Sequence, residues 1–325
     1  MRIVVAIHDL PVWTIPPAEV ARLARTLPDD RVVDAREPAE RRAAFADADV
    51  LFATKMSAEE FGLARHVRWI HSSAVGVGGL LPEPVVKSPV VVTNSKGVHS
   101  DAIAEHAIAL TLALRRHLHT AVIRQVAGEW AQAELHGPVT PPLAQTHLLV
   151  VGLGSIGSRV AELGAGLGMS VTGIRRRPDE PVPPGVTHVR GPEGLLDCLR
   201  TADVVVLTVP RTDETRALIG APELAVMKPT ALLINVARGK LIDDAALLDA
   251  LERGKIGGAG LDAFQKEPLP ADHPFWRAPR MLMTPHTASF AGDYWAPVVD
   301  LFLENLARFK RGDALLNVVN KTLGY

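Results

Sequence analysis

Cysteine, net charge and long apolar runs are all scarce in this 325-residue chain, and each scarcity excludes a class of protein. A single cysteine, Cys198, excludes an internal disulfide and any zinc site built from several cysteines. Lys and Arg number 35 and Asp and Glu 36, so a formal net charge of -1 creates no basic field for nucleic acid or an anionic membrane. No apolar run approaches the roughly 20 residues of a membrane-spanning helix, and the start MRIVVAIHDL lacks a signal-peptide pattern. We expect a cytoplasmic protein that binds neither nucleic acid nor a membrane.

The rest of the composition is that of a folded globular protein, with 47% hydrophobic and 22% charged residues, and its length is sufficient for two domains. From the N-terminus, helical runs alternate with β-rich runs, which are RIVVAI, RVVDA, DVLFA, VRWIHSS and VVVTN. Short apolar strands that alternate with helices predict parallel βαβ units, in which helices cover both faces of a sheet.

The segment 100–126 contains neither Gly nor Pro and opens with Ser100 and Asp101, which favour a helix start. Because its first half is apolar on nearly every side, we expect a buried helix that passes between domains or packs against a second subunit. A second alternating series follows, with the strand-like runs THLLVVG, MSVTGI, DVVVLTV, ALLINVA, GAGLDA and MLMTP. An amphipathic helix over residues 293–313 then returns the chain to the first domain. The expected fold class is α/β, with two doubly wound parallel-sheet domains.

Three glycines, Gly152, Gly154 and Gly157, have G-x-G-x-x-G spacing between a strand-like run and a helix-like run. The first allows a tight turn, the second lets the backbone approach a pyrophosphate, and the third lets the helix pack against the strand. Ser155 and Ile156 begin that helix, whose first N–H groups can bind phosphate. The pattern predicts a dinucleotide site.

The next strand ends in Arg175, Arg176 and Arg177, where a chain that binds NAD usually has an acidic residue. A carboxylate there would repel a 2′-phosphate, whereas a guanidinium can pair with it. A charge-assisted bond of about 1.5–3 kcal/mol would favour NADP over NAD by roughly one or two orders of magnitude. We expect Arg175 and Arg176 to bind this phosphate; the alternative is a solvated loop.

Charged side chains follow three of the later strands, as Arg238, Asp262 with Glu267, and His286. Ligands of open α/β sheets bind at the carboxyl ends of the strands, where these residues are expected to meet. An arginine can hold a substrate carboxylate, a histidine can give or take a hydroxyl proton, and a glutamate can orient that histidine. These three groups are sufficient to interconvert a 2-keto acid and a 2-hydroxy acid beside a nicotinamide.

The chain resembles the D-isomer-specific 2-hydroxyacid dehydrogenase family, which includes phosphoglycerate dehydrogenases and glyoxylate/hydroxypyruvate reductases. The resemblance covers nearly the whole chain and is most specific in GLGSIG, VPRTDETRALIG, NVARGKLIDDAALLDAL and GLDAFQKEPLP. It implies that Arg238 binds substrate, Glu267 supports the histidine, and His286 is the acid and base. It also implies that the Val75 and Gly76 N–H groups bind the substrate carboxylate.

The same resemblance implies a set of cofactor-binding residues, in which Asp262 lies at the nicotinamide end. The set is Gly152, Gly154, Ser155, Ile156, Gly157, Arg175, Arg176, Val209, Pro210, Thr215, Val236, Ala237, Asp262 and His286. It further implies a flavodoxin-like substrate domain over 1–99 plus 287–325, and an inserted Rossmann domain over 100–286 that carries the contact of a homodimer. Two residues depart from the family pattern: Arg175 replaces the acid of NAD-preferring members, and Gly78 stands where many members have Asp.

The expected function is therefore an oxidoreductase that interconverts small 2-keto acids, such as glyoxylate or hydroxypyruvate, and D-2-hydroxy acids, with NADP preferred or NAD as cofactor. His71, His99 and His106 lie in separate segments without a recognised metal spacing, so no metal is assigned. Two alternatives stay open: a sibling dehydrogenase that acts on another small anion, phosphite, and a nucleotide-sensing interaction protein similar to the corepressors that share this fold.

Overall fold

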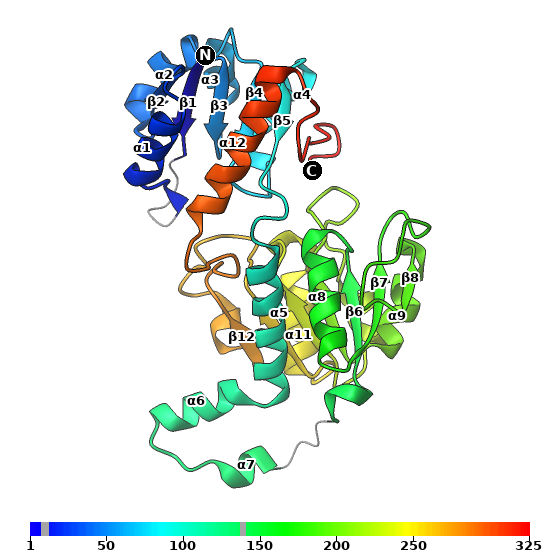
Figure 1. Cartoon of the computed structure of the whole chain (residues 1–325). Coiled ribbons are helices and arrows are strands. Elements are labelled where there is room, and N and C mark those ends of the chain that lie inside the picture. The colour runs from blue at the N-terminus through cyan, green and yellow to red at the C-terminus, as the bar shows by residue number, and fades with distance from the viewer. Residues whose placement is uncertain (8–12, 137–140) are drawn as a thin grey trace. The chain divides into compact units, whose positions relative to one another are not determined.

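The chain, described by a computed structural model over residues 1–7, 13–136 and 141–325, divides into two compact units. The terminal unit consists of Met1–Val98 and Ala291–Tyr325, and the central unit is His99–Phe290 (Figure 1). The terminal unit thus combines both ends of the chain, and the central unit is inserted between them. Each unit is built around one parallel sheet.

The sheet of the terminal unit has five parallel strands within the described residues, in the order β2-β1-β3-β4-β5. They are β1 (Arg2–Ala6), β2 (Arg31–Asp34), β3 (Val50–Ala53), β4 (Trp69–Ser72) and β5 (Val91–Thr93). Every strand predicted for this part of the sequence is confirmed. β3 is buried along its whole length, because helices cover both faces of a parallel sheet, and its sequence is accordingly a continuous apolar run.

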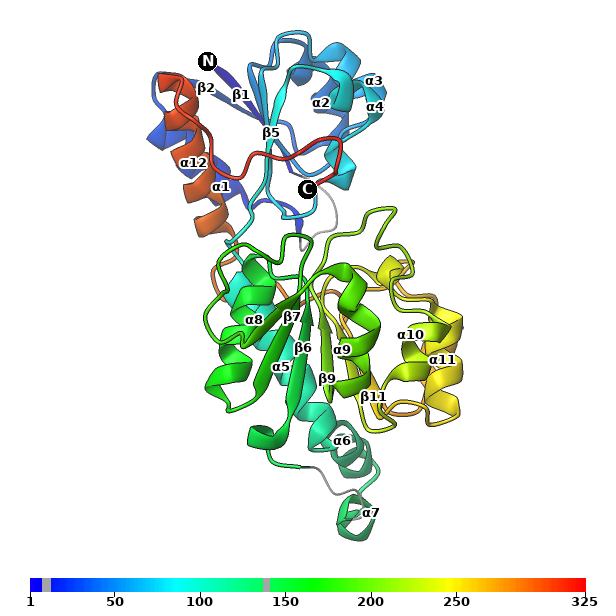
Figure 2. The ribbon, with the colours of Figure 1, turned by 90° about the vertical axis from the view of Figure 1, so that its right-hand side faces the viewer.

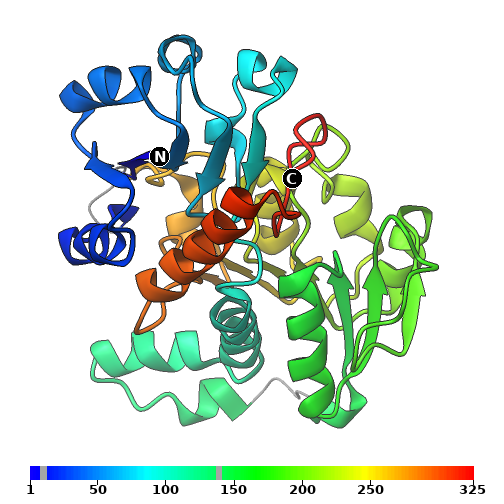
Figure 3. The same cartoon turned by 45° about the horizontal axis from the view of Figure 1, so that its top comes forward.

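Helices cover the two faces of this sheet with separate apolar clusters. On one face lie α1 (Pro17–Thr26) and α12 (Trp295–Arg311), the orange-red helix in Figures 1 and 3. On the other lie α2 (Pro38–Ala46), α3 (Ala58–Leu63) and α4 (Glu83–Lys87). Phe302 of α12 stacks on Phe52 with a centroid separation of 4.4 Å and on Trp69 at 5.2 Å. These ring contacts join the C-terminal helix to strands from the N-terminal part of the chain.

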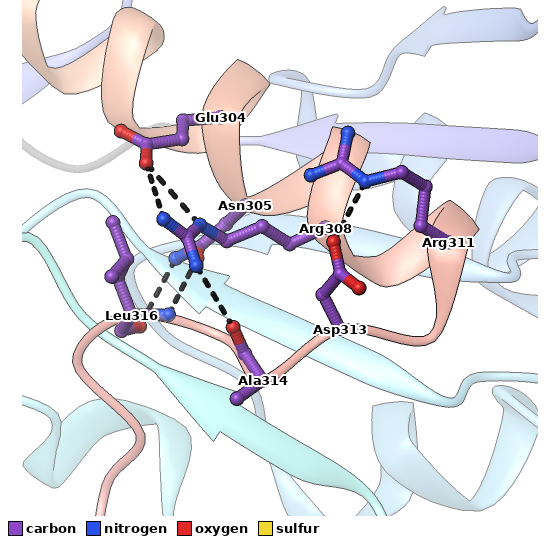
Figure 4. Close-up of polar contacts among 7 residues, drawn as sticks. All are labelled: Glu304, Asn305, Arg308, Arg311, Asp313, Ala314 and Leu316. Atoms are coloured by element: carbon purple, nitrogen blue, oxygen red, sulfur yellow. Dashed lines mark hydrogen bonds and ion pairs between the residues drawn. The ribbon is translucent and has the colours of Figure 1, made fainter.

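The tail after α12 is held by side chains of that helix (Figure 4). The buried Asn305 amide donates to the Leu316 carbonyl at 3.1 Å and accepts the Leu316 N–H at 2.7 Å. Arg308 adds a hydrogen bond to the Ala314 carbonyl at 3.3 Å. These bonds direct the tail back along β5, with which it forms an antiparallel bridge.

The sheet of the central unit has seven parallel strands in the described part of the chain, in the order β12-β11-β10-β9-β6-β7-β8. They are β6 (His147–Val151), β7 (Ser170–Ile174), β8 (His188–Arg190), β9 (Val204–Leu207), β10 (Leu232–Asn235), β11 (Gly258–Leu261) and β12 (Met281–Met283). The six predicted strands are confirmed, and β8 is an additional short edge strand whose polar sequence gave no strand signal. The strand order reverses at β6, between β9 and β7, which is where such sheets bind ligands.

Two layers of helices enclose this second sheet (Figure 2). α5 (Ser100–Arg115) and α8 (Ser155–Gly166) cover one face. α9 (Leu195–Thr201), α10 (Ala221–Val226) and α11 (Asp244–Glu252) cover the other. Cys198 of α9 is partly buried against the core, and burial raises the pKa of its thiol.

The prediction of one continuous helix over 100–126 is wrong. α5 ends at Arg115, His117 adopts a left-handed φ of 52°, and α6 (Leu118–Val126) begins after it. α5 is buried against the sheet, whereas α6 and α7 (Gln132–His136) lead away from it, as Figures 1 and 3 show. We call residues 118–136 the arm. Although the arm is partly apolar, none of the described helices has the length and apolar character needed to cross a membrane.

Candidate active site

The glycine loop after β6 has the backbone geometry that its spacing predicts. Gly152 has a φ of 103°, which a side chain would strain, and its N–H donates to the Ile174 carbonyl at 2.8 Å. A Cβ on Gly157 would lie 1.8 Å from the Gly152 oxygen, so only glycine allows α8 to begin this close to the strand. Thr208, which the sequence analysis did not select, donates its hydroxyl to the Gly152 oxygen at 2.6 Å. The loop thus presents the N-terminus of α8 at the carboxyl edge of the sheet, which fits a pyrophosphate.

The loops after β9 and β10 lie at the same carboxyl edge of the sheet. The side chain of Val209 fills the space beside Gly152. A Cβ added at Gly152 would lie 2.8 Å from Cγ1 of Val209. In the same loop, Thr215 donates its hydroxyl to the Pro210 carbonyl at 2.7 Å. After β10, Ala237 donates its N–H to the Asn235 side chain at 3.0 Å. The loop positions expected to contact cofactor therefore lie on ordered turns, and their cofactor contacts remain predictions.

The three arginines after β7 have different surroundings. Arg175 is only 11% exposed and its guanidinium donates to the carbonyls of Pro178 at 3.4 Å and Pro181 at 3.2 Å, so it holds its own loop together. Arg176 is 47% exposed, with Nη1 3.9 Å from an oxygen of Glu214. Arg177 is 81% exposed. Of the two arginines expected to bind a 2′-phosphate, Arg176 has the more accessible head group.

Arg238, Glu267 and His286 follow three adjacent strands, β10, β11 and β12. Asn235 ends β10 and its amide donates to the Arg238 carbonyl at 2.9 Å, which folds the turn that presents Arg238. A Cβ on Gly239 would lie 1.9 Å from the Phe264 carbonyl carbon, so the loop of Arg238 packs directly on the loop that leads to Glu267. Sequence reasoning missed Asn235, although a buried Asn before a turn is a recognised capping signal.

His286 and Glu267 form a hydrogen-bonded pair, with the imidazole Nδ1 2.7 Å from the carboxylate Oε2. The other oxygen of Glu267 accepts the Phe264 N–H at 2.8 Å. Burial raises the pKa of the Glu267 carboxyl, but these two hydrogen bonds and the charges of His286 and Arg238 outweigh burial and leave it below its ordinary value of 4.5. Glu267 is therefore an anion at neutral pH and can orient and stabilise an imidazolium.

Arg238 completes this group as the nearby cation. Its side chain is accessible to solvent, and its Nη1 donates to the Ala237 carbonyl at 2.7 Å. Desolvation by the surrounding protein lowers the pKa of Arg238, while the charge of Glu267 raises it, and the net shift is downward. A guanidinium is planar and presents a rigid fork of N–H donors, which matches the geometry of a carboxylate.

Asp262 lies directly after β11 and is 1% exposed. Its carboxylate accepts the N–H groups of Thr287 and Ala288, which immediately follow His286 in the chain. His286 itself has a left-handed φ of 56°. The structure thus brings Asp262 to the turn of His286, and its expected contact with nicotinamide remains a prediction.

Val75 and Gly76 belong to the terminal unit, in the loop that follows β4. Two residues at the end of β5 hold this loop: Asn94 donates its amide to the Val75 carbonyl at 2.8 Å, and Ser95 donates its N–H to the Ala74 carbonyl at 3.2 Å. Neither Asn94 nor Ser95 was selected from the sequence. Within the described residues, no group of three or more His, Cys, Asp or Glu side chains could hold a metal ion.

A parallel sheet with a glycine loop at its switch point, and a His–Glu pair beside an arginine at the same edge, define the class of dinucleotide-dependent dehydrogenases. Residues 108–288 match the family model described as D-isomer specific 2-hydroxyacid dehydrogenase, NAD binding domain. The chain is 34% identical over 282 residues to a glyoxylate reductase of Korarchaeum cryptofilum, which covers 83% of this chain and 81% of that protein. The chain belongs to the D-isomer specific 2-hydroxyacid dehydrogenase family. It is an NAD(P)-dependent oxidoreductase that acts on CH–OH groups.

Solved structures agree over the full length. An NADPH-dependent glyoxylate/hydroxypyruvate reductase of Sinorhizobium meliloti, in complex with NADP and sulfate, has a TM-score of 0.85 at 26% identity and covers 100% of this chain and 99% of that one. A D-isomer specific 2-hydroxyacid dehydrogenase of Xanthobacter autotrophicus, in complex with NADPH and MES, has a TM-score of 0.84 at 28% identity and covers 99% of both chains.

Proposed function

We propose that this enzyme is an NADPH-preferring reductase of small 2-keto acids such as glyoxylate or hydroxypyruvate, which it converts to D-2-hydroxy acids. The observation that carries the proposal is the His286–Glu267 pair, bonded at 2.7 Å, with Arg238 close enough to influence the charge of Glu267. The names of the relatives support the substrate class, since the protein from Korarchaeum cryptofilum is a glyoxylate reductase.

The site residues have separate roles in this reaction. The Arg238 guanidinium binds the substrate carboxylate as a bidentate donor. The Val75 and Gly76 N–H groups also donate to this carboxylate. Glu267 engages Nδ1 of His286, so Nε2 is the nitrogen that we assign to the substrate oxygen. His286 holds a proton at Nε2 and donates it to the keto oxygen as that oxygen becomes negative. A nicotinamide held at this edge of the sheet would supply the hydride that the keto carbon accepts.

The preference for NADP rests on the region after β7. The Gly152 N–H donates to the Ile174 carbonyl, so the end of this strand lies beside the glycine loop, which supports a role for Arg175 and Arg176 near the ribose. Arg175 keeps the loop in shape through its carbonyl contacts, and Arg176 pairs with the 2′-phosphate. Its contact with Glu214 is an exposed ion pair, which costs little to exchange for a phosphate.

The proposal also includes a homodimer formed through the central unit, in the cytoplasm. Large apolar side chains are exposed on the arm, where Val126 is 85% and Trp130 91% exposed. Between α5 and α8 the same unit carries a groove lined by Ile108, Leu112 and Leu163 among other residues. A second copy of the chain that covers both surfaces would remove this apolar area from water.

The test is the initial rate of NADPH and of NADH oxidation by the purified enzyme with glyoxylate, hydroxypyruvate and pyruvate in turn. We expect kcat/KM to be at least about tenfold higher with NADPH, and R176A to lose about tenfold of that preference. R177A is the matched control, because Arg177 is the most exposed of the three, and it should leave the preference unchanged. Faster oxidation of NADH would contradict the cofactor assignment but not the family.

Neither alternative function is favoured by the relatives, which include several glyoxylate reductases and a D-3-phosphoglycerate dehydrogenase. Absence of turnover with every keto acid and both cofactors would contradict the proposed substrate class. In that case, NADP-dependent phosphite oxidation would be measured next.

A further inference from the structure

His106, on α5, has a place in the structure that its sequence context did not suggest. Its Nε2 lies 2.9 Å from the Thr284 hydroxyl and 3.6 Å from Oδ1 of Asp262. Its side chain is 22% exposed. The imidazole therefore reaches from the helix that covers the sheet to the segment just before His286.

The direction of each hydrogen bond follows from the donors present. A carboxylate oxygen accepts hydrogen bonds, so Oδ1 of Asp262 accepts both the Thr284 hydroxyl at 2.6 Å and the Thr287 N–H at 2.8 Å. The single proton of the Thr284 hydroxyl is donated to Asp262. The hydroxyl oxygen must therefore accept in its contact with His106, and His106 Nε2–H is the donor. Nε2–H is present in a cationic imidazole and in one of the two neutral forms, so the bond does not require His106 to be charged.

Asp262 is the point at which these bonds meet. Its second oxygen accepts the Ala288 N–H at 3.0 Å, so one buried carboxylate anchors the turn on both sides of His286. His286 needs such anchoring because its φ of 56° is unfavourable for a residue with a side chain, and the surrounding contacts must hold it there. If the hydrogen bonds of Asp262 to this turn weaken, the His286 imidazole moves relative to Glu267 and the substrate.

We propose that His106 is a positioning residue for His286, acting through the Thr284 hydroxyl on the Asp262 carboxylate. This inference rests on the proposed acid and base role of His286. His106 supplies the outermost bond of the chain His106–Thr284–Asp262, and it ties α5 to the turn across 178 positions of sequence. Loss of that bond loosens the turn without removing any group that touches the substrate.

The first test compares H106L, which removes the donor, with H106Q, which keeps an N–H donor at a similar reach. We expect H106L to lower kcat about fivefold, the change that corresponds to roughly 1 kcal/mol, with KM for the keto acid and NADPH within about twofold of the wild type. H106Q should recover most of kcat. T111V is the matched control on the same helix, since Thr111 is buried and donates its hydroxyl to the Ala107 carbonyl at 2.8 Å. It should lower thermal stability slightly and leave kcat unchanged.

A double-mutant cycle tests whether Thr284 is the route. T284V removes the hydroxyl between the two groups, so adding H106L to T284V should cause no further loss of kcat. Additive losses would overturn the proposal, and so would a kcat for H106L equal to that of the wild type. Equal losses in H106L and H106Q would also overturn it, because they would show that packing and not the N–H matters.

Amide hydrogen exchange gives a measurement that does not depend on the reaction. H106L and T284V should speed exchange of the Thr287 and Ala288 N–H groups, which donate to Asp262, and T111V should not. If the wild type reduces no keto acid, the proposed function fails, but this exchange result still supports or rejects the anchoring by His106. Unchanged exchange in H106L would overturn the anchoring even in an active enzyme.

Discussion

At the scale of single residues, the behaviour of Glu267 is decided by competing electrostatic effects. Burial alone would favour the neutral acid, yet two hydrogen bonds and two nearby positive charges keep the carboxylate ionised. Its pKa below the ordinary value means that the anion persists throughout the neutral range. The benefit to His286 is lost only as the pH falls through this lowered pKa, that is, below about 4.5.

The E267Q variant tests this role, since an amide keeps the size of the side chain and removes its charge. We expect kcat to fall about 10- to 100-fold at neutral pH, because the imidazolium loses its stabilising anion and part of its orientation. Steady-state rates with NADPH and the best keto acid measure the effect. E252Q, at the exposed end of α11, is the control and should behave as the wild type. An unchanged kcat in E267Q would remove Glu267 from the mechanism.

At the scale of elements, the chain uses the carboxyl ends of parallel strands to assemble residues that are far apart in sequence. β10, β11 and β12 are neighbours in the sheet, so Arg238, Asp262 and His286 meet although helices and loops separate them in the chain. The break between α5 and α6 has a different effect. It separates the buried helix that carries His106 from the exposed arm.

The arm yields a prediction at this scale. Leu118, Val122 and Val126 recur at helical spacing on α6, and Ile123 lies beside them with 64% of its surface exposed. If they bind a second copy, wild-type protein should show twice the chain mass of 34.8 kDa in light scattering, and a V122E/I123E variant should shift toward the single-chain mass. Burying the two new carboxylates in an apolar contact costs free energy, so the variant should dissociate.

A matched control exists on another element of the same unit. Leu196 of α9 is also an exposed large apolar residue, at 42%, and L196E should leave the mass unchanged. A wild-type mass equal to one chain would refute the dimer, and so would a V122E/I123E variant that stays double.

At the scale of the whole molecule, buried histidines make stability depend on pH. His71 is fully buried among the rings of Phe52, Trp69 and Phe302, and desolvation lowers its pKa to about 3. Desolvation also lowers the pKa of His99 to about 4. Since the unfolded chain protonates such groups near pH 6.5 and the folded chain does not, the free energy of unfolding falls as the pH drops below 6.5.

The predicted size of this effect for His71 is about 2 kcal/mol between pH 7 and pH 5. Denaturant unfolding followed by circular dichroism at the two pH values measures it. An H71Q variant, although less stable at pH 7, should lose about 2 kcal/mol less than the wild type between the two values. H188Q, at an exposed position on β8, should follow the wild type. Parallel pH dependence in H71Q and the wild type would contradict the assignment.

Much of the fold could be predicted because the relevant signals are local. Parallel strands covered on both faces need continuous apolar runs, and these identified every strand of both sheets except β8, whose three residues are mostly polar. The helix break at His117 could not be predicted from composition, because the segment has neither Gly nor Pro. Hydrophobic periodicity indicates which residues favour a helix. The end of α5 depends on tertiary contacts, which periodicity does not contain.

The sequence by itself determined the α/β class, the glycine loop, and the placement of Arg238, Glu267 and His286 after strand ends, since each depends on spacing within one segment. Tertiary structure alone decided which groups fix those residues in place. Asn94 holds the Val75 loop, Arg175 is engaged by its own loop while Arg176 is accessible, and His106 reaches Thr284. The reason is physical: a hydrogen bond depends on distance and direction in space, and residues 178 positions apart carry no local pattern that records their contact.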